Sequence, residues 1–119
     1  MIVPLMIWKK DIMPMNDYRI TLTQRAVEDI KDIGDYIAFI LLQPHISKNF
    51  IKGLKNSISH LKLFPYKFPL VQDDYLQSQG IRCMPFKNFY IFYKVIEDVP
   101  TVVILRVGYN KRNWKNILT

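Results

Sequence analysis

Apolar residues recur at steps of three and four in two stretches of the chain, and this spacing predicts two amphipathic helices. In the first stretch, from Gln24 to about Leu42, the apolar positions are Ala26, Ile30, Ile33, Ile37, Ile40 and Leu41. Its polar side is filled by Glu28, Asp29, Lys31, Asp32 and Asp35. In the second stretch, from His45 to Phe64, one side carries Ile46, Phe50, Leu54, Ile58 and Leu61, and the opposite side carries Lys48, Lys52, Lys55 and Lys62.

Residues with known effects on helix ends bound these two stretches. Thr23 is a candidate N-cap, since its hydroxyl can accept from a free amide in the first turn. Pro44 stops the first helix and lies near the start of the second, and so short a link predicts an antiparallel helical hairpin. Gly34 weakens the first helix by about 1 kcal/mol relative to alanine and permits close packing on a neighbour. The lysine stripe of the second helix is interpreted as a solvated face, with phosphate contact as the alternative.

Strand patterns flank the helical region. Tyr18–Leu22 is β-branched and aromatic enough for a short first strand, and Ile81–Phe86, Phe89–Ile96 and Thr101–Tyr109 follow the helices. Short turns join the last three, which predicts an antiparallel meander and an α+β fold of strand, helical hairpin and meander. Between Pro65 and Gly80 we expect an irregular loop at the rim of a binding surface.

Alternation along the middle strand predicts which side chains face the helices. Phe89, Ile91, Tyr93 and Val95 form an apolar face expected to pack on the helix pair, and Tyr90, Phe92, Lys94 and Ile96 form a partly open face.

Length and charge bound the function. At 119 residues the chain is long enough for one domain, placed at residues 16–119, and it carries a net charge of +7. From Arg82 onward, seven basic residues against two acidic ones give +5, whereas ten against eight give +2 before it. This asymmetry favours a localised basic surface for an anionic partner, the alternative being a generally basic exterior.

Other features narrow the class of protein. Cys83 is the single cysteine, which excludes a disulfide framework or a cysteine metal cluster and fits a cytoplasmic location. His45 and His60 are separated by the length of the second helix and lack acidic neighbours, so we expect neither to be a metal ligand or part of a catalytic pair. Residues 1–15 do not fit a secretory signal or a membrane span. We interpret them as an N-terminal arm or as the product of a mis-assigned start, with initiation at Met13 or Met15.

The order of short motifs in the C-terminal third resembles the RelE/ParE family of bacterial type II toxins. The motifs are Ile81-Arg82, then Asn88-Phe-Tyr-Ile-Phe-Tyr-Lys-Val95, then Val103-Ile-Leu-Arg-Val-Gly-Tyr109, then Lys111-Arg112-Asn113-Trp114. The resemblance covers nearly everything from Tyr18 to Leu118. It implies a compact α+β toxin without a metal or cofactor, held inactive by a cognate antitoxin that is acidic and partly disordered.

The family divides by target, and the residues favour one branch. RelE-like members cut messenger RNA on the ribosome and place an arginine in the middle strand, where this chain has Tyr90. ParE-like members poison DNA gyrase, and the ending from Arg106 to Leu118 resembles theirs. We therefore expect a gyrase-binding toxin without chemistry of its own. The alternatives are a metal-independent, ribosome-dependent endoribonuclease and a non-toxic basic nucleic-acid-binding module.

The expected site follows from the same resemblance and from side-chain chemistry. Residues expected to contact the target or the antitoxin are Arg82, Tyr90, Lys94, Arg106, Tyr109, Lys111, Arg112 and Trp114. If the chain is a nuclease, Tyr109, Arg112 and Arg82 are the catalytic candidates, handling protons and the scissile phosphate. Two alternatives stay open: Arg82 neutralises Asp73 or Asp74, and Trp114, Ile117 and Leu118 pack back on the core.

Overall fold

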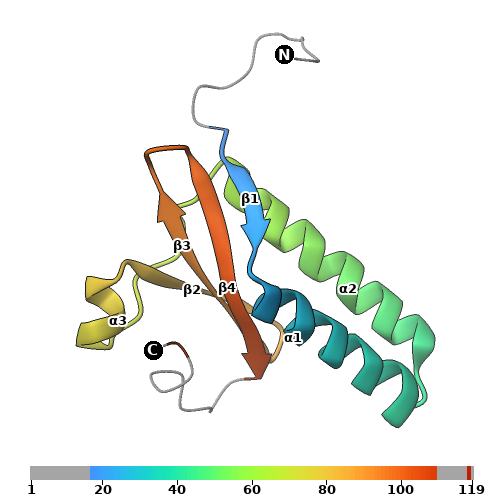
Figure 1. The fold of residues 1–119 in the computed structure, drawn as a ribbon. Helices are drawn as coiled ribbons and strands as arrows, with labels where there is room; N and C mark the ends of the chain where they lie inside the picture. The colour runs from blue at the N-terminus through green and yellow to red at the C-terminus, as the bar shows by residue number, and fades with distance from the viewer. Residues whose placement is uncertain (1–16, 110–117, 119) are drawn as a thin grey trace, which may run out of the picture.

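A four-stranded mixed sheet carries a helical hairpin on one face (Figure 1). The computed structural model describes residues 17–109 and Leu118. Along the chain the elements are β1 (Arg19–Leu22), α1 (Gln24–Asp35), the π-helical turn η1 (Tyr36–Ile40), α2 (Pro44–Ser59), the 3-10 turn η2 (His60–Lys62), α3 (Asp74–Ser78), β2 (Ile81–Phe86), β3 (Phe89–Ile96) and β4 (Thr101–Tyr109). The predicted α+β class, with its first strand, helical hairpin and meander, is confirmed.

The predicted cap starts the first helix. The Thr23 hydroxyl accepts from the backbone N–H of Ala26 at 3.0 Å and donates to the carbonyl of Leu105 at 2.8 Å, so one side chain ties the helix start to the sheet. α1 does not run unbroken to Leu42, because its last turn widens into η1. α2 then begins at Pro44, where the missing N–H costs nothing.

Gly34 brings the two helices close together, as predicted. A β-carbon there would lie 3.3 Å from Cδ1 of Ile51, tighter than an ordinary contact. The buried Ser47 hydroxyl donates to the carbonyl of Gly34 at 2.6 Å. This bond satisfies a polar group inside the helix interface, which would otherwise be costly.

The sheet order is β1-β4-β3-β2, so the first strand lies beside the last. β2, β3 and β4 form the predicted antiparallel meander, whereas β1 runs parallel to β4, with Arg19 opposite Thr101 and Leu22 opposite Ile104. Lys87 adopts a φ of 53° in the tight turn between β2 and β3, and the favoured two-residue hairpin loops require a positive φ at this first position.

One extra residue interrupts the β3–β4 ladder. Phe92 pairs with Arg106 and Tyr93 with Ile104, so Leu105 has no counterpart. This β-bulge lets both Ile104 and Val107 reach the core although they are three residues apart.

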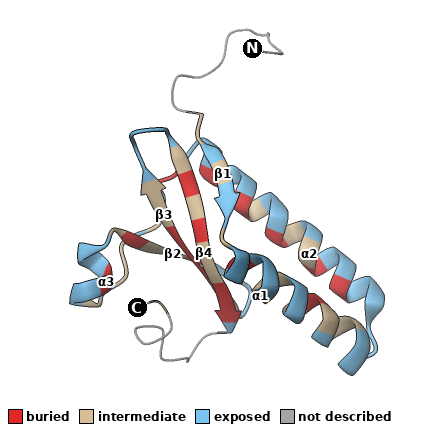
Figure 2. Cartoon of the chain, viewed as in Figure 1, coloured by how far each residue is buried: buried red, intermediate tan, exposed pale blue. Residues whose placement is uncertain are grey.

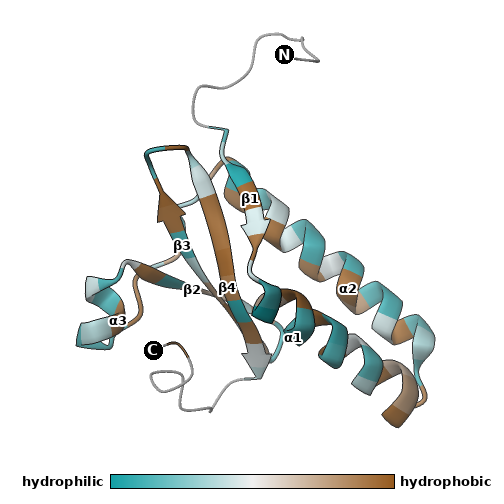
Figure 3. Cartoon of the chain, in the orientation of Figure 1, coloured by the Kyte–Doolittle hydropathy of each residue, from teal (hydrophilic) through white to brown (hydrophobic). Residues whose placement is uncertain are grey.

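The helix-facing side of the sheet forms the main core (Figure 2). Ile91 and Tyr93 are fully buried there against Phe50 and Leu54 of α2, as the alternation of β3 predicts. The ring of Phe50 also meets Phe86 and Phe89 edge-on at 5.3 and 5.2 Å. In Figure 3 the hydrophobic colour runs along much of β4 and alternates with hydrophilic colour along α2.

The opposite face of the sheet is less open than predicted. Phe92 is only 2% exposed and packs in a second apolar cluster with Leu76 of α3 and Ile81 of β2. The prediction of a partly open face is therefore wrong for Phe92, although Tyr90 and Lys94 are half-buried and Ile96 is exposed. The cause is α3, which places Leu76 over this face.

The region expected to be an irregular loop contains α3. Asp73 caps it by accepting from the backbone N–H of Leu76 at 3.0 Å. Upstream of α3, Val71 N–H donates to the Ile81 carbonyl and Cys83 N–H to the Pro69 carbonyl, covering part of the outer edge of β2. Within the described residues, none of the helices combines the length and apolarity that a bilayer span requires.

Candidate functional site

Tyr90 and Lys94 lie on the face of the sheet away from the helical hairpin. Both alternate with Phe92 along β3, and the rings of Tyr90 and Phe92 meet edge-on with centroids 6.3 Å apart. Register puts Tyr90 beside Pro85 and Lys94 beside Ile81 of β2. This face therefore presents a ring with a hydroxyl and an ammonium group next to the apolar cluster under α3. These two predicted contact residues share one surface, which we call the β3 outer face.

Arg106 is engaged inside the molecule. Its Nε donates to one oxygen of Asp29 at 2.8 Å and its Nη2 to the other at 3.0 Å. Both side chains are mostly buried, at 18% and 15% exposure. The hydrogen bond to Asp29 raises the pKa of Arg106, so the guanidinium stays charged at every physiological pH.

Asp29 also accepts the backbone N–H of Val107 at 2.9 Å. β1 ends at Leu22, opposite Ile104, so no strand of the described chain covers this part of the β4 edge. The Asp29 carboxylate therefore supplies the acceptor that a neighbouring strand would give. Our sequence interpretation placed Asp29 among the polar side chains of the first helix and missed this contact.

Arg82 projects from the other face of the sheet. It pairs with Tyr93, whose side chain lies in the main core, whereas Tyr90 and Lys94 point the opposite way. Its Nη1 donates to the carbonyl of Phe68 at 2.8 Å, and its guanidinium lies 4.9 Å from the centre of the Tyr66 ring. Arg82 thus fastens the segment after α2 to the sheet.

Tyr66, on which Arg82 stacks, belongs to a hydroxyl cluster around Glu97. Tyr18 donates to Glu97 at 2.9 Å, and Tyr66 donates to the same carboxylate. Tyr66 also lines a shallow, mainly apolar hollow of about 590 Å³ with Leu63 and Phe64. The cluster joins the start of the described chain, the segment after η2 and the turn between β3 and β4.

Tyr109 ends β4 with half of its surface exposed. Its ring packs edge-on against Phe89 at 5.5 Å, which places it on the helix-facing side of the sheet. Arg82 and Tyr109 are separated by β3 and by four register positions, or roughly 13 Å along the strands. The structure does not bring these two candidate catalytic residues together.

After Tyr109 the structure describes a single residue, Leu118. Leu118 packs against the second apolar cluster beside Leu76 and Phe92, which confirms the packing alternative for this residue. Lys111, Arg112, Trp114 and Ile117 lie outside the described residues, as do residues 1–15, and their predicted functions stay predictions.

The single cysteine and the two histidines do not form a reactive site in the described structure. Burial raises the pKa of the Cys83 thiol to about 11, so it is not a thiolate at neutral pH. His45 and His60 lie near opposite ends of α2 and are exposed. Among the described residues, no three His, Cys, Asp or Glu side chains gather in a way that could hold a metal ion.

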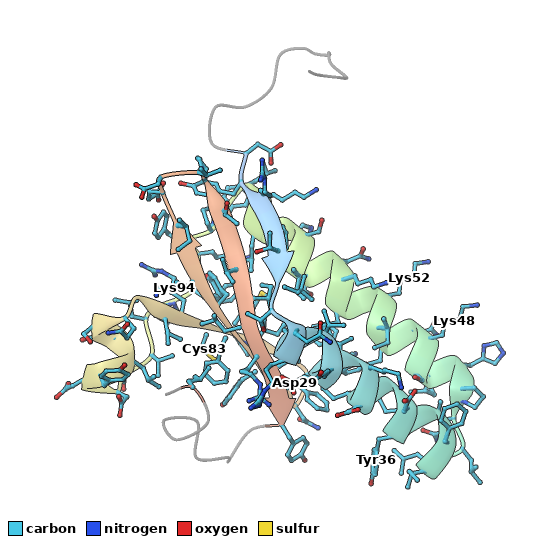
Figure 4. All side chains as sticks on the ribbon, in the orientation of Figure 1. Asp29, Tyr36, Lys48, Lys52, Cys83 and Lys94 are labelled. Carbon is cyan, nitrogen blue, oxygen red and sulfur yellow. The ribbon has the colours of Figure 1, made fainter. Side chains whose placement is uncertain are left out.

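The lysine stripe of α2 is solvent-exposed, as interpreted from the sequence. Lys48 and Lys52 point away from the body of the molecule in Figure 4, and Lys55 and Lys62 are also exposed. This stripe lies on the outer side of the helical hairpin, so it forms a basic surface separate from the β3 outer face.

A family model and several solved structures relate this chain to known toxins. Residues 20–114 match the model of the family described as the ParE toxin of the type II toxin–antitoxin system parDE. The chain belongs to the ParE toxin family. No curated protein shows a significant sequence match to the chain.

Solved structures share this ParE-family fold at low sequence identity. The chromosomal ParDE system of P. aeruginosa aligns with a TM-score of 0.65 at 16% identity, covering 79% of this chain and 97% of that one. The RelBE2 toxin–antitoxin complex of Mycobacterium tuberculosis aligns with a TM-score of 0.56 at 20% identity, covering 79% and 99%. The intact RelBE complex of E. coli gives 0.56 at 15% identity, covering 80% and 99%. At these identities the likeness establishes the fold, which both branches share.

Proposed function

We propose that this toxin arrests bacterial growth by binding DNA gyrase and that a cognate antitoxin neutralises it in the cytoplasm. The observation that carries the proposal is the match of residues 20–114 to the ParE family, whose resemblance implies gyrase as the target. In this reading the protein acts by occupying its target and needs no catalytic group.

The positions of the candidate catalytic side chains support binding over catalysis. General acid–base cleavage of RNA needs proton-transferring groups and a cation within hydrogen-bond reach of one phosphate. Arg82 is bonded to Phe68 and stacked on Tyr66, and Tyr109 lies several register positions away across β3. Tyr90 occupies the position where the nuclease branch places an arginine.

The β3 outer face is the part of the described surface best suited to the target. Tyr90 supplies a ring and a hydroxyl, and Lys94 supplies a cation, on a rigid strand in the middle of the sheet. Arg106 contributes from within, since its pair with Asp29 stabilises the adjoining strand. Lys111, Arg112 and Trp114 extend the proposed contact set.

The antitoxin proposal rests on charge and on the solved relatives. Structures of this fold from P. aeruginosa, M. tuberculosis and E. coli are described as ParDE or RelBE systems and complexes. A net charge of +7 suits an acidic partner that folds on binding. Charge attraction makes association faster and sensitive to salt.

Two assays of the purified protein test the target. We expect inhibition of gyrase supercoiling. We expect no mRNA cleavage when ribosomes programmed with mRNA are incubated with the protein. Cleavage at the ribosomal A site without gyrase inhibition would instead establish the RelE-like endoribonuclease, the second candidate, whose fold this chain shares. Controlled expression that leaves growth unchanged would favour a non-toxic nucleic-acid-binding module.

A further inference from the structure

The tip of the helical hairpin carries a concentrated apolar surface. Six large side chains are exposed there, and we call them the hairpin-tip patch: Tyr36 (54%), Phe39 (69%), Ile40 (67%), Leu41 (47%), Leu42 (79%) and Ile46 (54%). They come from η1, from the link and from the first turn of α2, at the end of the hairpin farthest from the sheet (Figures 1 and 2). Figure 3 shows the hydrophobic colouring continuing to this end.

The patch is not a by-product of core packing. Ile33 and Ile37 from the first helical stretch and Ile51 from the second already pack against the main core. Residues 36–43 include no charged side chain. A solvent-facing hairpin tip would ordinarily carry polar residues, so the exposed rings and branched chains here exceed what the fold needs.

Leu42 is the residue of the patch that the fold itself needs least. It has a φ of 56°, a left-handed conformation in which glycine or asparagine is favoured, and its side chain is 79% exposed. The fold alone would be better served by a small or polar residue at this position. A leucine held in a disfavoured conformation with its side chain in solvent points to a contact outside the chain.

The widened turn η1 helps to form this surface. It spans Tyr36–Ile40, and π-helical turns are rare and frequent at functional sites. Tyr36 projects away from the sheet in Figure 4. The patch is thus built by two local departures from ordinary helix geometry, η1 and Leu42.

We propose that the hairpin-tip patch is the interface through which two copies of this chain form a dimer. Its exposed area is on the order of 700 Å², above most apolar patches of monomers and close to the area that each partner buries in a standard interface. In a two-fold dimer the same patch supplies both sides of the interface, so the apolar side chains of one copy pack against those of the other.

The charges around the patch favour a second copy over an acidic partner. The rim carries both signs, with the exposed pair of Lys31 and Asp35 at 2.7 Å on α1 and the exposed Lys48 on α2. An acidic peptide would find no cation at the centre of the patch. A two-fold axis through the tip instead brings rims of mixed charge together, and this dimer leaves the β3 outer face on the opposite side of the fold uncovered.

Sedimentation velocity of the purified full-length chain tests the proposal between about 1 and 100 µM. The wild-type protein is expected to dimerise in this range. Leu42→Asn removes the apolar side chain and suits the left-handed backbone, so the variant should fold normally and weaken the dimer about tenfold or more. Phe39→Ser is a second, independent variant with the same expected effect.

Leu63→Asn is the matched control, because Leu63 is a leucine with 45% exposure outside the patch. The proposal requires that this variant dimerise like the wild type. A wild-type protein that stays monomeric at 100 µM overturns it, and so does a dimer that survives both patch substitutions or is lost equally in the control. Circular dichroism melts of each variant identify any loss that comes from unfolding.

Discussion

Asp29 and Arg106 face each other across the boundary between α1 and β4, joined by two hydrogen bonds of 2.8 and 3.0 Å. The same carboxylate accepts the N–H of Val107. One side chain therefore neutralises a buried cation and completes the edge of the sheet where β1 stops. Arginine in a basic C-terminal region is easily interpreted as a target contact, but here its guanidinium bonds a carboxylate of α1 and holds that helix to the sheet.

Asp29→Asn is expected to lower the free energy of unfolding by about 2–4 kcal/mol, because Arg106 keeps its charge and loses its partner. Urea unfolding followed by circular dichroism measures the change. Asp35→Asn is the matched control, since its pair with Lys31 is exposed to solvent and its loss should change the free energy of unfolding much less. Equal losses in the two variants would contradict a structural function for Asp29.

Cys83 should resist alkylation in the folded protein. Its pKa of about 11 lies above that of an unfolded thiol, so folding favours the protonated form and leaves roughly 100-fold less thiolate near pH 8. The stability that Cys83 contributes is complete below the unfolded pKa and is lost as pH rises towards 11. Mass spectrometry after iodoacetamide treatment, with and without denaturant, checks this; rapid labelling of the native protein would refute it.

Lys94→Glu is expected to reduce toxicity at least tenfold, because it reverses a charge on the β3 outer face. Lys52→Glu makes the same charge change on the exposed outer side of α2 and should leave toxicity within about twofold. Colony counts after graded induction, corrected for protein level, give the comparison. If both variants lose toxicity alike, net charge and not the β3 outer face determines activity.

Tyr109→Phe should retain toxicity within a few-fold, since the ring packs on Phe89 and the gyrase proposal asks no chemistry of the hydroxyl. Loss of a proton-transferring hydroxyl would reduce activity by about 10²-fold or more. The same induction assay measures this, with a thermal melt to establish that the variant is folded. A large loss in a folded protein would support the endoribonuclease alternative.

Elements with a strong local signal were predictable from the sequence. The Thr23 cap, the close packing at Gly34 and the turn at Lys87-Asn88 each depend on a few neighbouring residues, and each lies where the sequence indicated. The alternation of β3 likewise predicts its core face, because side chains in a strand change sides at every residue.

Features that depend on distant parts of the chain were not predictable in this way. Nothing beside Asp29 in the sequence indicates that it meets Arg106, which is 77 positions away. The burial of Phe92 depends on α3, a five-residue helix too short to show a hydrophobic period. Arg82 and Tyr90 were grouped by charge and aromaticity, and only the register of β2 and β3 shows that they occupy opposite faces.

The parallel pairing of β1 with β4 determines when, during synthesis, the four-stranded sheet can form. Arg19 meets Thr101, so the first strand has no partner until some eighty further residues have been synthesised, or about 4–16 s at ordinary translation rates. The finished sheet, and any toxicity that requires it, therefore cannot form before β4 has been synthesised. Until then the chain lacks both the strand that pairs with β1 and the arginine that pairs with Asp29.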